Sequence, residues 1–182
     1  MTAMTVMPDG VAEWTVDDLD RLPDDGLRYE LLDGILLVSP TPTRRHQRAT
    51  LQLGLLLQAV CPPEMEVLVA PLDWRPDRKT SLQPDGLVLG NRDLTSTAAE
   101  SMSLAVEVLS PSSRRKDAIY KHSKYEDEGV ASYWIVDPEA PSIIALDLVD
   151  GRYEVVSEAL GDQAVTLDKP FPVTIAPSSL IR

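Results

Sequence analysis

The chain has 182 residues, which is the usual size of one domain and enough to bury one hydrophobic core. Hydrophobic residues make up 43% and charged residues 25% of it, which excludes a wholly disordered or low-complexity chain. The net charge of −12 argues against non-specific coating of nucleic acid or membranes, and the single cysteine excludes a disulfide framework and a Cys-rich zinc site. We expect a cytoplasmic protein without a membrane span, with residues 1–12 as a flexible tail and residues 13–182 as a single domain.

The first third of the chain predicts a short helix, a hairpin and a long helix. A helix-capping threonine opens residues 15–22, and the proline that follows should end that helix. Apolar runs on both sides of Asp33-Gly34 predict a hairpin with a two-residue turn. Leucines at helical spacing, between a threonine and two prolines, predict a helix over residues 43–60.

The middle of the chain predicts three strands. Residues 66–74 and 87–89 have the apolar composition of strands, and the polar residues 75–82 between them predict a loop. Residues 104–109 are apolar except for one glutamate, which is typical of a central strand that is covered on both faces.

The last third predicts a further helix, a strand and a second hairpin. A serine at position 112 or 113 can cap a helix that should end at Gly129. Residues 133–136 predict a strand, apolar runs around Asp150-Gly151 predict a hairpin, and the remainder predicts one or two short edge strands. Helices separated by runs of strands indicate a mixed sheet with helices packed on it.

Two carboxylates occupy unusual positions. Asp85 lies where a strand begins, and Glu107 lies inside an otherwise apolar strand. If neighbouring strands bring the two acids together, a divalent cation such as Mg²⁺ would relieve their repulsion, because it accepts carboxylate oxygens and keeps several waters. The alternative is that Glu107 pairs with an arginine or lysine while Asp85 caps a turn.

One stripe of the helix after Glu107 carries three polar side chains, at i, i+4 and i+8: Asp117, Lys121 and Tyr125. On this stripe Lys121 can reach back over the end of the Glu107 strand. The alternative is that Lys121 and Asp117 form an ordinary solvated pair on the helix surface.

Four further residues receive separate interpretations. Glu30 lies in the first hairpin, and His46 lies in the first turn of the long helix, where anions such as phosphate are favoured. A lone histidine is usually structural, and we interpret His122 as plain helix surface. Lys124 should face away from the stripe of Lys121, so its replacement should be nearly silent.

The positive charges lie mainly near these candidates although the protein is acidic. Eleven of the 17 cations flank the candidate segments or precede Asp85, and Arg28 is among those placed elsewhere. The eleven are Arg44, Arg45, Arg48, Arg75, Arg78, Lys79, Arg114, Arg115, Lys116, Lys121 and Lys124. This distribution suggests a polyanionic substrate. The alternative is that helix starts and loops are simply exposed, but cations are unfavourable for a helix start, which favours phosphate binding.

Four segments together resemble the Uma family of restriction endonucleases. They are YELLDGILLVSPTPTRRHQ, QPDGLVL, LAVEVLSPSSRRKDAIYKHSKY and GVASYWIVDP, and the resemblance covers about residues 15–158. It implies the PD-(D/E)xK nuclease superfamily and an α/β fold. That fold is a restriction-endonuclease-like mixed β-sheet core flanked by helices, here with an N-terminal hairpin and a C-terminal β extension.

The same resemblance implies a divalent-metal-dependent endonuclease that hydrolyses phosphodiester bonds in nucleic acid, DNA above all. Asp85 and Glu107 match the acids that hold Mg²⁺ or Mn²⁺. The superfamily's lysine lies two residues after the second acid, where this chain has Leu109, and Lys121 matches a lysine that the Uma family carries in the next helix. A homodimer is possible, since many nucleases pair to cut two strands.

The expected site therefore has a catalytic group and a phosphate-binding group. The catalytic residues are Asp85, Glu107, Lys121 and Glu30, and the substrate-binding residues are His46, Arg44, Arg45, Arg114 and Tyr125. Two alternatives belong to other classes: an inactive nuclease-fold module that binds nucleic acid or a protein partner, and a structural scaffold whose acids and bases pair internally. Metal titration separates the enzyme from both.

Overall fold

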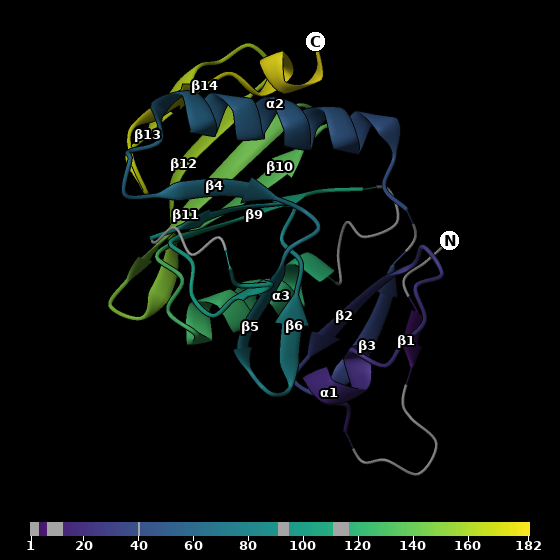
Figure 1. Ribbon diagram of the computed structural model, residues 1–182. Coiled ribbons are helices and arrows are strands. Elements are labelled where there is room, and N and C mark those ends of the chain that lie inside the picture. The colour runs from purple at the N-terminus through teal and green to yellow at the C-terminus, as the bar shows by residue number, and fades with distance from the viewer. Residues whose placement is uncertain (1–3, 7–12, 40, 91–94, 111–116) are drawn as a thin grey trace.

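The computed structural model describes residues 4–6, 13–39, 41–90, 95–110 and 117–182. These residues form two lobes, one above the other in Figure 1. The upper lobe contains a six-stranded sheet covered by the long helix α2 (Arg44–Val60), and the lower lobe contains a second six-stranded sheet. Within the described part of the chain, no helix has the length and apolar character needed to cross a membrane.

The upper, central sheet has a mixed strand pattern, as the sequence predicts. Across the sheet its strands are β12 (Arg152–Leu160), β11 (Ser142–Val149), β10 (Ser132–Asp137), β9 (Leu104–Val108), β7 (Gly86–Leu89) and β4 (Glu66–Val69). Strands β9 and β10 run parallel, and all the other neighbours are antiparallel. A parallel pair needs a crossover, and helix α3 (Asp117–Asp127) lies in this connection.

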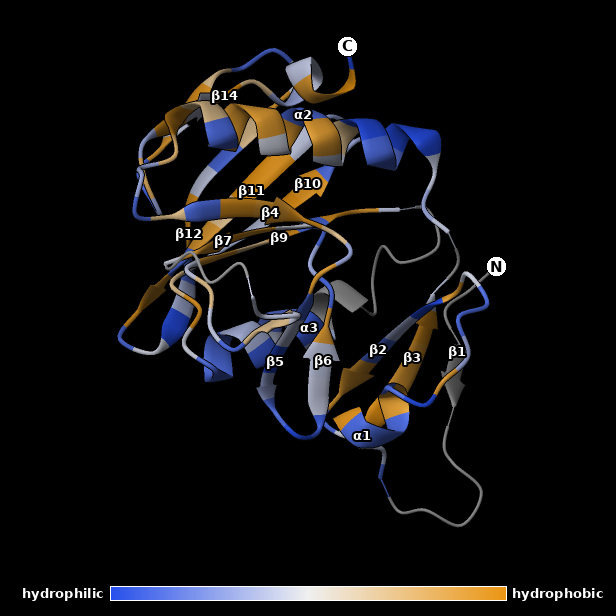
Figure 2. Ribbon diagram, in the orientation of Figure 1, coloured by the Kyte–Doolittle hydropathy of each residue, from blue (hydrophilic) through white to orange (hydrophobic). Residues whose placement is uncertain are grey.

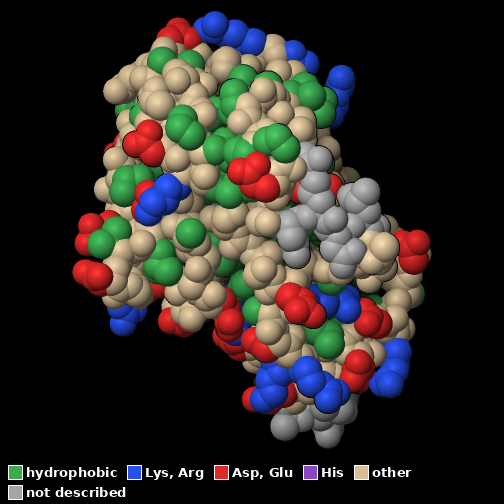
Figure 3. Space-filling view, turned by 60° about the vertical axis from the view of Figure 1, so that its left-hand side comes forward, with side chains coloured by type: hydrophobic (Ala, Val, Ile, Leu, Met, Phe, Trp, Pro, Cys, Tyr) green, Lys and Arg blue, Asp and Glu red, His purple; other side chains and the backbone are tan. Residues whose placement is uncertain are grey.

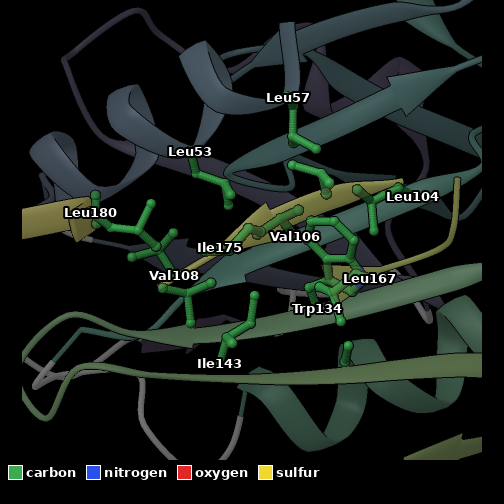
Figure 4. Close-up of a cluster of buried hydrophobic side chains, with 14 of the residues drawn as sticks. Leu53, Leu57, Leu104, Val106, Val108, Trp134, Ile143, Leu167, Ile175 and Leu180 are labelled. Atoms are coloured by element: carbon green, nitrogen blue, oxygen red, sulfur yellow. The ribbon is translucent and has the colours of Figure 1, made fainter. Parts of the chain in front are cut away.

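The two faces of the central sheet are covered by different helices. Leu53 of α2 and Val106 of β9 share one buried cluster, shown in Figure 4. Tyr125 of α3 belongs to a second cluster, together with Ala105 of β9. Side chains alternate between the faces along a strand, so the odd-numbered residues of β9 face α3. This alternation places Glu107 on the face that α3 covers.

The lower sheet contains the predicted first hairpin. Its strands are β1 (Met4–Val6), β3 (Ile35–Ser39), β2 (Arg28–Leu32), β6 (Thr80–Leu82), β5 (Asp73–Asp77) and β8 (Ala98–Ala99). Asp33 and Gly34 connect β2 to β3, with φ angles of 48° and 81°, as a two-residue turn with two positive φ angles requires. The short helix α1 (Val16–Leu19) packs beside β2.

The C-terminal residues do not extend the central sheet. The predicted edge strands β13 (Val165–Leu167) and β14 (Val173–Ile175) pair with each other instead. A one-turn 3₁₀ helix, η1 (Pro177–Ile181), follows them and packs with α2, in the upper part of Figure 1. The C-terminal β extension therefore closes the core on the α2 side.

Two predictions about residues 66–82 are wrong. The strand predicted over residues 66–74 ends at Val69, because Pro71 has no N–H with which to continue the ladder. The residues predicted as a loop contain most of the β5–β6 hairpin, whose polar side chains hide the strand pattern. Thr80 and Ser81 are fully buried in this hairpin, so its polar composition does not indicate exposure.

Two predictions fall largely outside the described residues: the N-terminal tail and the start of the helix after Glu107. Residues 4–6 of the expected tail form β1, which pairs with β3, and the other residues of 1–12 are not described. The predicted start of the helix at Ser112 or Ser113 also lies outside the described residues, and α3 is described from Asp117.

Candidate active site

Three carboxylates from separate strands are buried where the two lobes meet. Glu30 comes from β2, Asp85 immediately precedes β7, and Glu107 comes from β9. Their exposed fractions are 3%, 3% and 9%. Charged groups this deeply buried require partners, and the partners decide the protonation state of each acid.

Asp85 has three donors and is held as an anion. Its Oδ2 accepts from the Val108 N–H at 2.8 Å and lies 3.1 Å from His46 Nε2, while Oδ1 accepts from Arg28 Nη1 at 3.2 Å. Burial alone would raise the pKa of Asp85, but the hydrogen bond from His46 and the charge of Arg28 outweigh it and lower the pKa. The alternative that Asp85 only caps a turn is therefore wrong.

Glu107 is the one of the three acids whose pKa is raised in the fold. Lys121 Nζ lies 3.2 and 3.3 Å from its two oxygens, and the Tyr125 hydroxyl donates to Oε1 at 2.9 Å. Burial raises the pKa of Glu107 to about 7; Lys121 opposes the shift, and the charges of Asp85 and Glu30 add to it. Glu107 is thus half-protonated near neutral pH. The pairing of Glu107 with a lysine, one of the two alternatives from the sequence, is present.

Lys121, which lies on α3, contacts two of the three acids. Its Nζ donates to Glu30 Oε1 at 2.8 Å, a shorter contact than either contact to Glu107. The Gln83 N–H and Arg28 Nη2 also donate to Glu30 Oε1, at 2.8 and 3.1 Å. Burial would raise the pKa of Glu30, but Arg28 and Lys121 lower it, so Glu30 is ionised. Burial likewise fails to neutralise Lys121, because the two acids raise its pKa.

Arg28 belongs to the site, although the sequence analysis places it elsewhere. It bridges Glu30 and Asp85, and these acids outweigh burial and raise its pKa. The signal was present in the sequence, because residues i and i+2 of a strand share one face and Arg28 is two residues before Glu30. Gln83 was also missed, since its contribution is a backbone N–H, which no residue type reveals.

The expected substrate-binding residues do not gather into one group. Tyr125 is fully buried, so it holds Glu107 and is not accessible to a substrate. Arg45 Nε donates to the Pro138 carbonyl at 2.6 Å, and Arg44 is exposed at the start of α2, which is hydrophilic at that end in Figure 2. Arg114 lies outside the described residues. His46 is buried against Asp85, so His46 and Tyr125 are the two of these residues that contact the cluster.

Lys124 and His122 are also misassigned by the sequence. Lys124 is only 8% exposed and forms ion pairs with Asp33, Asp77 and Glu128. His122 is half-buried, with ring centroids 5.9 Å from Tyr133 and 5.2 Å from Tyr153. Neither residue is plain helix surface, because α3 is pressed between the central sheet and the hairpins of the lower lobe.

The basic side chains are dispersed more evenly than their sequence positions suggest. Arg75 pairs with Asp20 and Asp73, and Arg78 pairs with Asp17. On the face shown in Figure 3, acidic and basic side chains are intermixed. Among the described lysines and arginines, those in contact with the three carboxylates are therefore Arg28 and Lys121.

A pocket of about 520 Å³ opens beside this cluster, with Arg28, His46 and Asp85 in its lining. Its other walls come from the loop before β2, the first turns of α2 and the loop between β4 and β5. Of the three buried acids, Asp85 is the one that lines this preformed cavity, and such a cavity is the usual form of a ligand site.

The donor set fits a magnesium-like ion held by few protein ligands. In the described residues no three His, Cys, Asp or Glu side chains converge closely enough to form a complete cage. Mg²⁺ does not need one, since it commonly binds one or two carboxylates and keeps several waters. Asp85 and Glu107 are the two acids that would offer such oxygens, and burial, which the charge of Lys121 only partly offsets, raises the pKa of Glu107.

Comparisons with known proteins identify the family and the fold of the chain. The model of the family described as "Uma2: Putative restriction endonuclease" matches residues 16–178. A solved structure from Anabaena variabilis, described as a putative nuclease belonging to DUF820, is similar with a TM-score of 0.72. The two chains are 16% identical over 92% of this chain and 97% of that one, so this likeness concerns the fold alone. It confirms the predicted restriction-endonuclease-like α/β fold.

No curated protein matches the chain. The family model, however, spans most of its length and includes every residue of the buried cluster. The chain therefore belongs to the Uma2 family.

Proposed function

We propose that the protein is a metal-dependent nuclease that hydrolyses phosphodiester bonds, with DNA as the first substrate to test. The observation that carries the proposal is a cluster of three buried carboxylates in which Lys121 contacts Glu30 and Glu107, while Asp85 lines an open pocket. The ammonium of Lys121 occupies the role that Leu109 cannot fill, and it reaches the acids from the helix instead of from the strand.

Each residue of the buried cluster has its own role in this proposal. Asp85 and Glu107 would hold Mg²⁺ or Mn²⁺, which activates a bound water and polarises the scissile phosphate. Lys121 orients the water and stabilises the negative charge that develops. Arg28 and His46 keep Asp85 ionised, and Tyr125 fixes the Glu107 carboxylate by its hydrogen bond.

Glu107 gives the proposal a characteristic pH dependence. Its pKa of about 7 means that a proton competes with the metal near neutral pH. We expect affinity for Mg²⁺ and any cleavage rate to rise between about pH 6 and pH 8. Calorimetric titration of Mg²⁺ at several pH values measures this directly.

The decisive experiment compares cleavage by wild type, Glu107→Ala and Lys169→Met on single- and double-stranded DNA and RNA with Mg²⁺ or Mn²⁺. Lys169 is half-exposed, and its ion pair is with Asp147, which is not part of the cluster. Lys169→Met therefore serves as the control for the loss of a charge elsewhere in the protein. We expect cleavage by wild type and the control only. Equal metal binding by wild type and Glu107→Ala would contradict the assignment of the metal ligands.

The second candidate is a nuclease-fold module that binds nucleic acid without cutting it. It is favoured by Leu109 at the usual position of the lysine and by the ion pairs that Glu107 and Glu30 already have. Such a module does not need Mg²⁺. Wild type that binds an oligonucleotide but neither binds the metal nor cuts would support this second candidate.

A further inference from the structure

The pocket beside Asp85 has apolar walls near its opening. Leu22 and Leu27 come from the loop before β2, Pro42 precedes α2, and Pro71 lies between β4 and β5. Leu27 is 48% exposed, so its side chain is accessible from solvent. Flat apolar surfaces of this kind suit the face of a ring, and the volume of about 520 Å³ lies within the usual range for small-molecule pockets.

The charges in the pocket do not suit a phosphate. Two guanidinium groups line it, and both already have acidic partners: Arg28 pairs with Glu30 and Asp85, and Arg75 pairs with Asp20 and Asp73. The lining aspartates are Asp20, Asp24, Asp73 and Asp85. An anion placed inside would meet carboxylates without an uncommitted cation among the lining residues, so a neutral group is favoured.

Polar atoms without partners gather around the same pocket. In the described residues, Arg28 Nε, His46 Nδ1 and Thr50 Oγ1 are buried without a hydrogen-bond partner, and all three residues line this cavity. The His46 residue is only 6% exposed. These three atoms have almost no accessible surface, whereas Gln47 lines the cavity and is exposed, so its side-chain amide is available to the polar edge of a ligand.

From these observations we propose that the pocket receives one unpaired nucleobase of the substrate strand, next to the phosphate at the acidic cluster. A base combines a ring face with edge donors and acceptors and carries no charge. A base can enter only if it is free of its partner strand, so the substrate class is single-stranded or locally unpaired nucleic acid. This inference rests on the proposed function, because the cluster must position the phosphate.

Binding measured without cleavage tests the inference separately. Ca²⁺ is a hard cation that takes oxygen ligands and can replace Mg²⁺ in the titration. The probes are a labelled single-stranded oligonucleotide, a set of copies with one abasic position each, the matching duplex, and a free nucleoside monophosphate. Loss of one base at the pocket should weaken binding about fivefold or more, the lower range for a bound base. The duplex should bind more weakly by a similar factor, and the free nucleotide should compete only weakly.

Two substitutions inside the pocket and one outside complete the test. Gln47→Leu and Thr50→Val remove polar groups from the lining, and each should reduce the difference between intact and abasic strands. Gln58→Leu is the matched control, since Gln58 is exposed on the same helix and does not line the pocket. It should leave the difference unchanged.

The outcomes separate the two proposals. Base-dependent binding that Gln47→Leu abolishes supports the inference even if wild type cuts nothing, in which case only the proposed function fails. Cleavage with equal affinity for intact and abasic strands overturns the inference and leaves the nuclease proposal standing. Tighter binding of the duplex, or no binding of any oligonucleotide, also overturns the inference.

Discussion

Lys121 and Lys124 lie one turn apart on α3, and both are buried against carboxylates, yet their environments differ. Lys121 contacts Glu30 and Glu107, whose side chains are 4% and 12% exposed. Lys124 contacts Asp33, Asp77 and Glu128, whose side chains are 64%, 39% and 32% exposed. The lysines themselves are similarly hidden, so the difference lies in the acids.

This comparison teaches that the exposure of the partners decides what a buried lysine contributes. If Lys124 is removed, its three acids can be hydrated, because water already reaches them. If Lys121 is removed, Glu107 loses the cation that contacts it and Glu30 keeps only Arg28, while neither buried acid can be hydrated, which is costly. Lys124 therefore attaches α3 to the lower lobe, and Lys121 makes the acidic cluster possible.

The largest effect expected is that of Lys121→Met. The substitution keeps the apolar stem but removes the cation that contacts Glu107 and one of the two that contact Glu30, so it should destabilise the metal-free protein by about 3–5 kcal/mol. Urea denaturation measures it. Adding Glu107→Gln to this variant should restore part of the loss, because one of the two stranded charges disappears. A loss below about 1 kcal/mol would show instead that water reaches the cluster.

The next effect concerns Glu107→Gln and pH. The pKa of Glu107 is 4.5 in its ordinary state and about 7 in the fold. A raised pKa means that the stability contributed by this group is full below about pH 4.5 and is lost as pH rises through 7. Glu107→Gln should abolish that decline and be at least as stable as wild type at pH 8 without metal. Stability curves for both proteins from pH 5 to pH 8 check this, and parallel curves would contradict the assigned pKa.

Lys124→Met should have a smaller effect than Lys121→Met. Its three ion pairs involve exposed acids, each worth well under 1 kcal/mol, so we expect a loss of about 1–2 kcal/mol. The effect should shrink when salt is raised, because solvent-exposed charges are screened, whereas the effect of Lys121→Met should hardly change. Denaturation at low and high NaCl tests both. An equal salt response of the two variants would remove the distinction between the lysines.

The smallest effect expected is that of Lys169→Met. Lys169 is 50% exposed and its Nζ lies 3.5 Å from Asp147, a weak contact at the surface. We expect a change in unfolding free energy within about 0.5 kcal/mol, which makes it the reference for the other lysine variants. A larger loss would indicate that surface charge as such affects this acidic protein.

Much of the fold can be predicted from local patterns. Asp33-Gly34 and Asp150-Gly151 mark hairpin turns, and the leucines of α2 mark a helix that covers a sheet. Asp85 and Glu107 are prominent because a carboxylate in an apolar strand has few explanations. These signals are short-range, so they do not depend on knowing the neighbours in space.

The residues that sequence reasoning missed depend on long-range contacts. Arg28 appears ordinary until β2 is placed beside Asp85, 57 residues further along the chain. Lys124 appears to be surface until the turns that carry Asp33 and Asp77 are packed against α3. The side chains of the β5–β6 hairpin are polar, and they form ion pairs and hydrogen bonds in the fold. The hydropathy of these residues alone therefore predicts a loop.

The order of the cluster along the chain has a consequence for its synthesis. The acids emerge from the ribosome first, at positions 30, 85 and 107, and their shared lysine emerges only at position 121. Until then the lysine that contacts Glu107 is missing, so docking of β9 beside β7 is disfavoured unless Glu107 is protonated. We therefore expect β9 to dock only after α3 has been made, and the strands that follow α3, from β10 to β12, then complete the sheet.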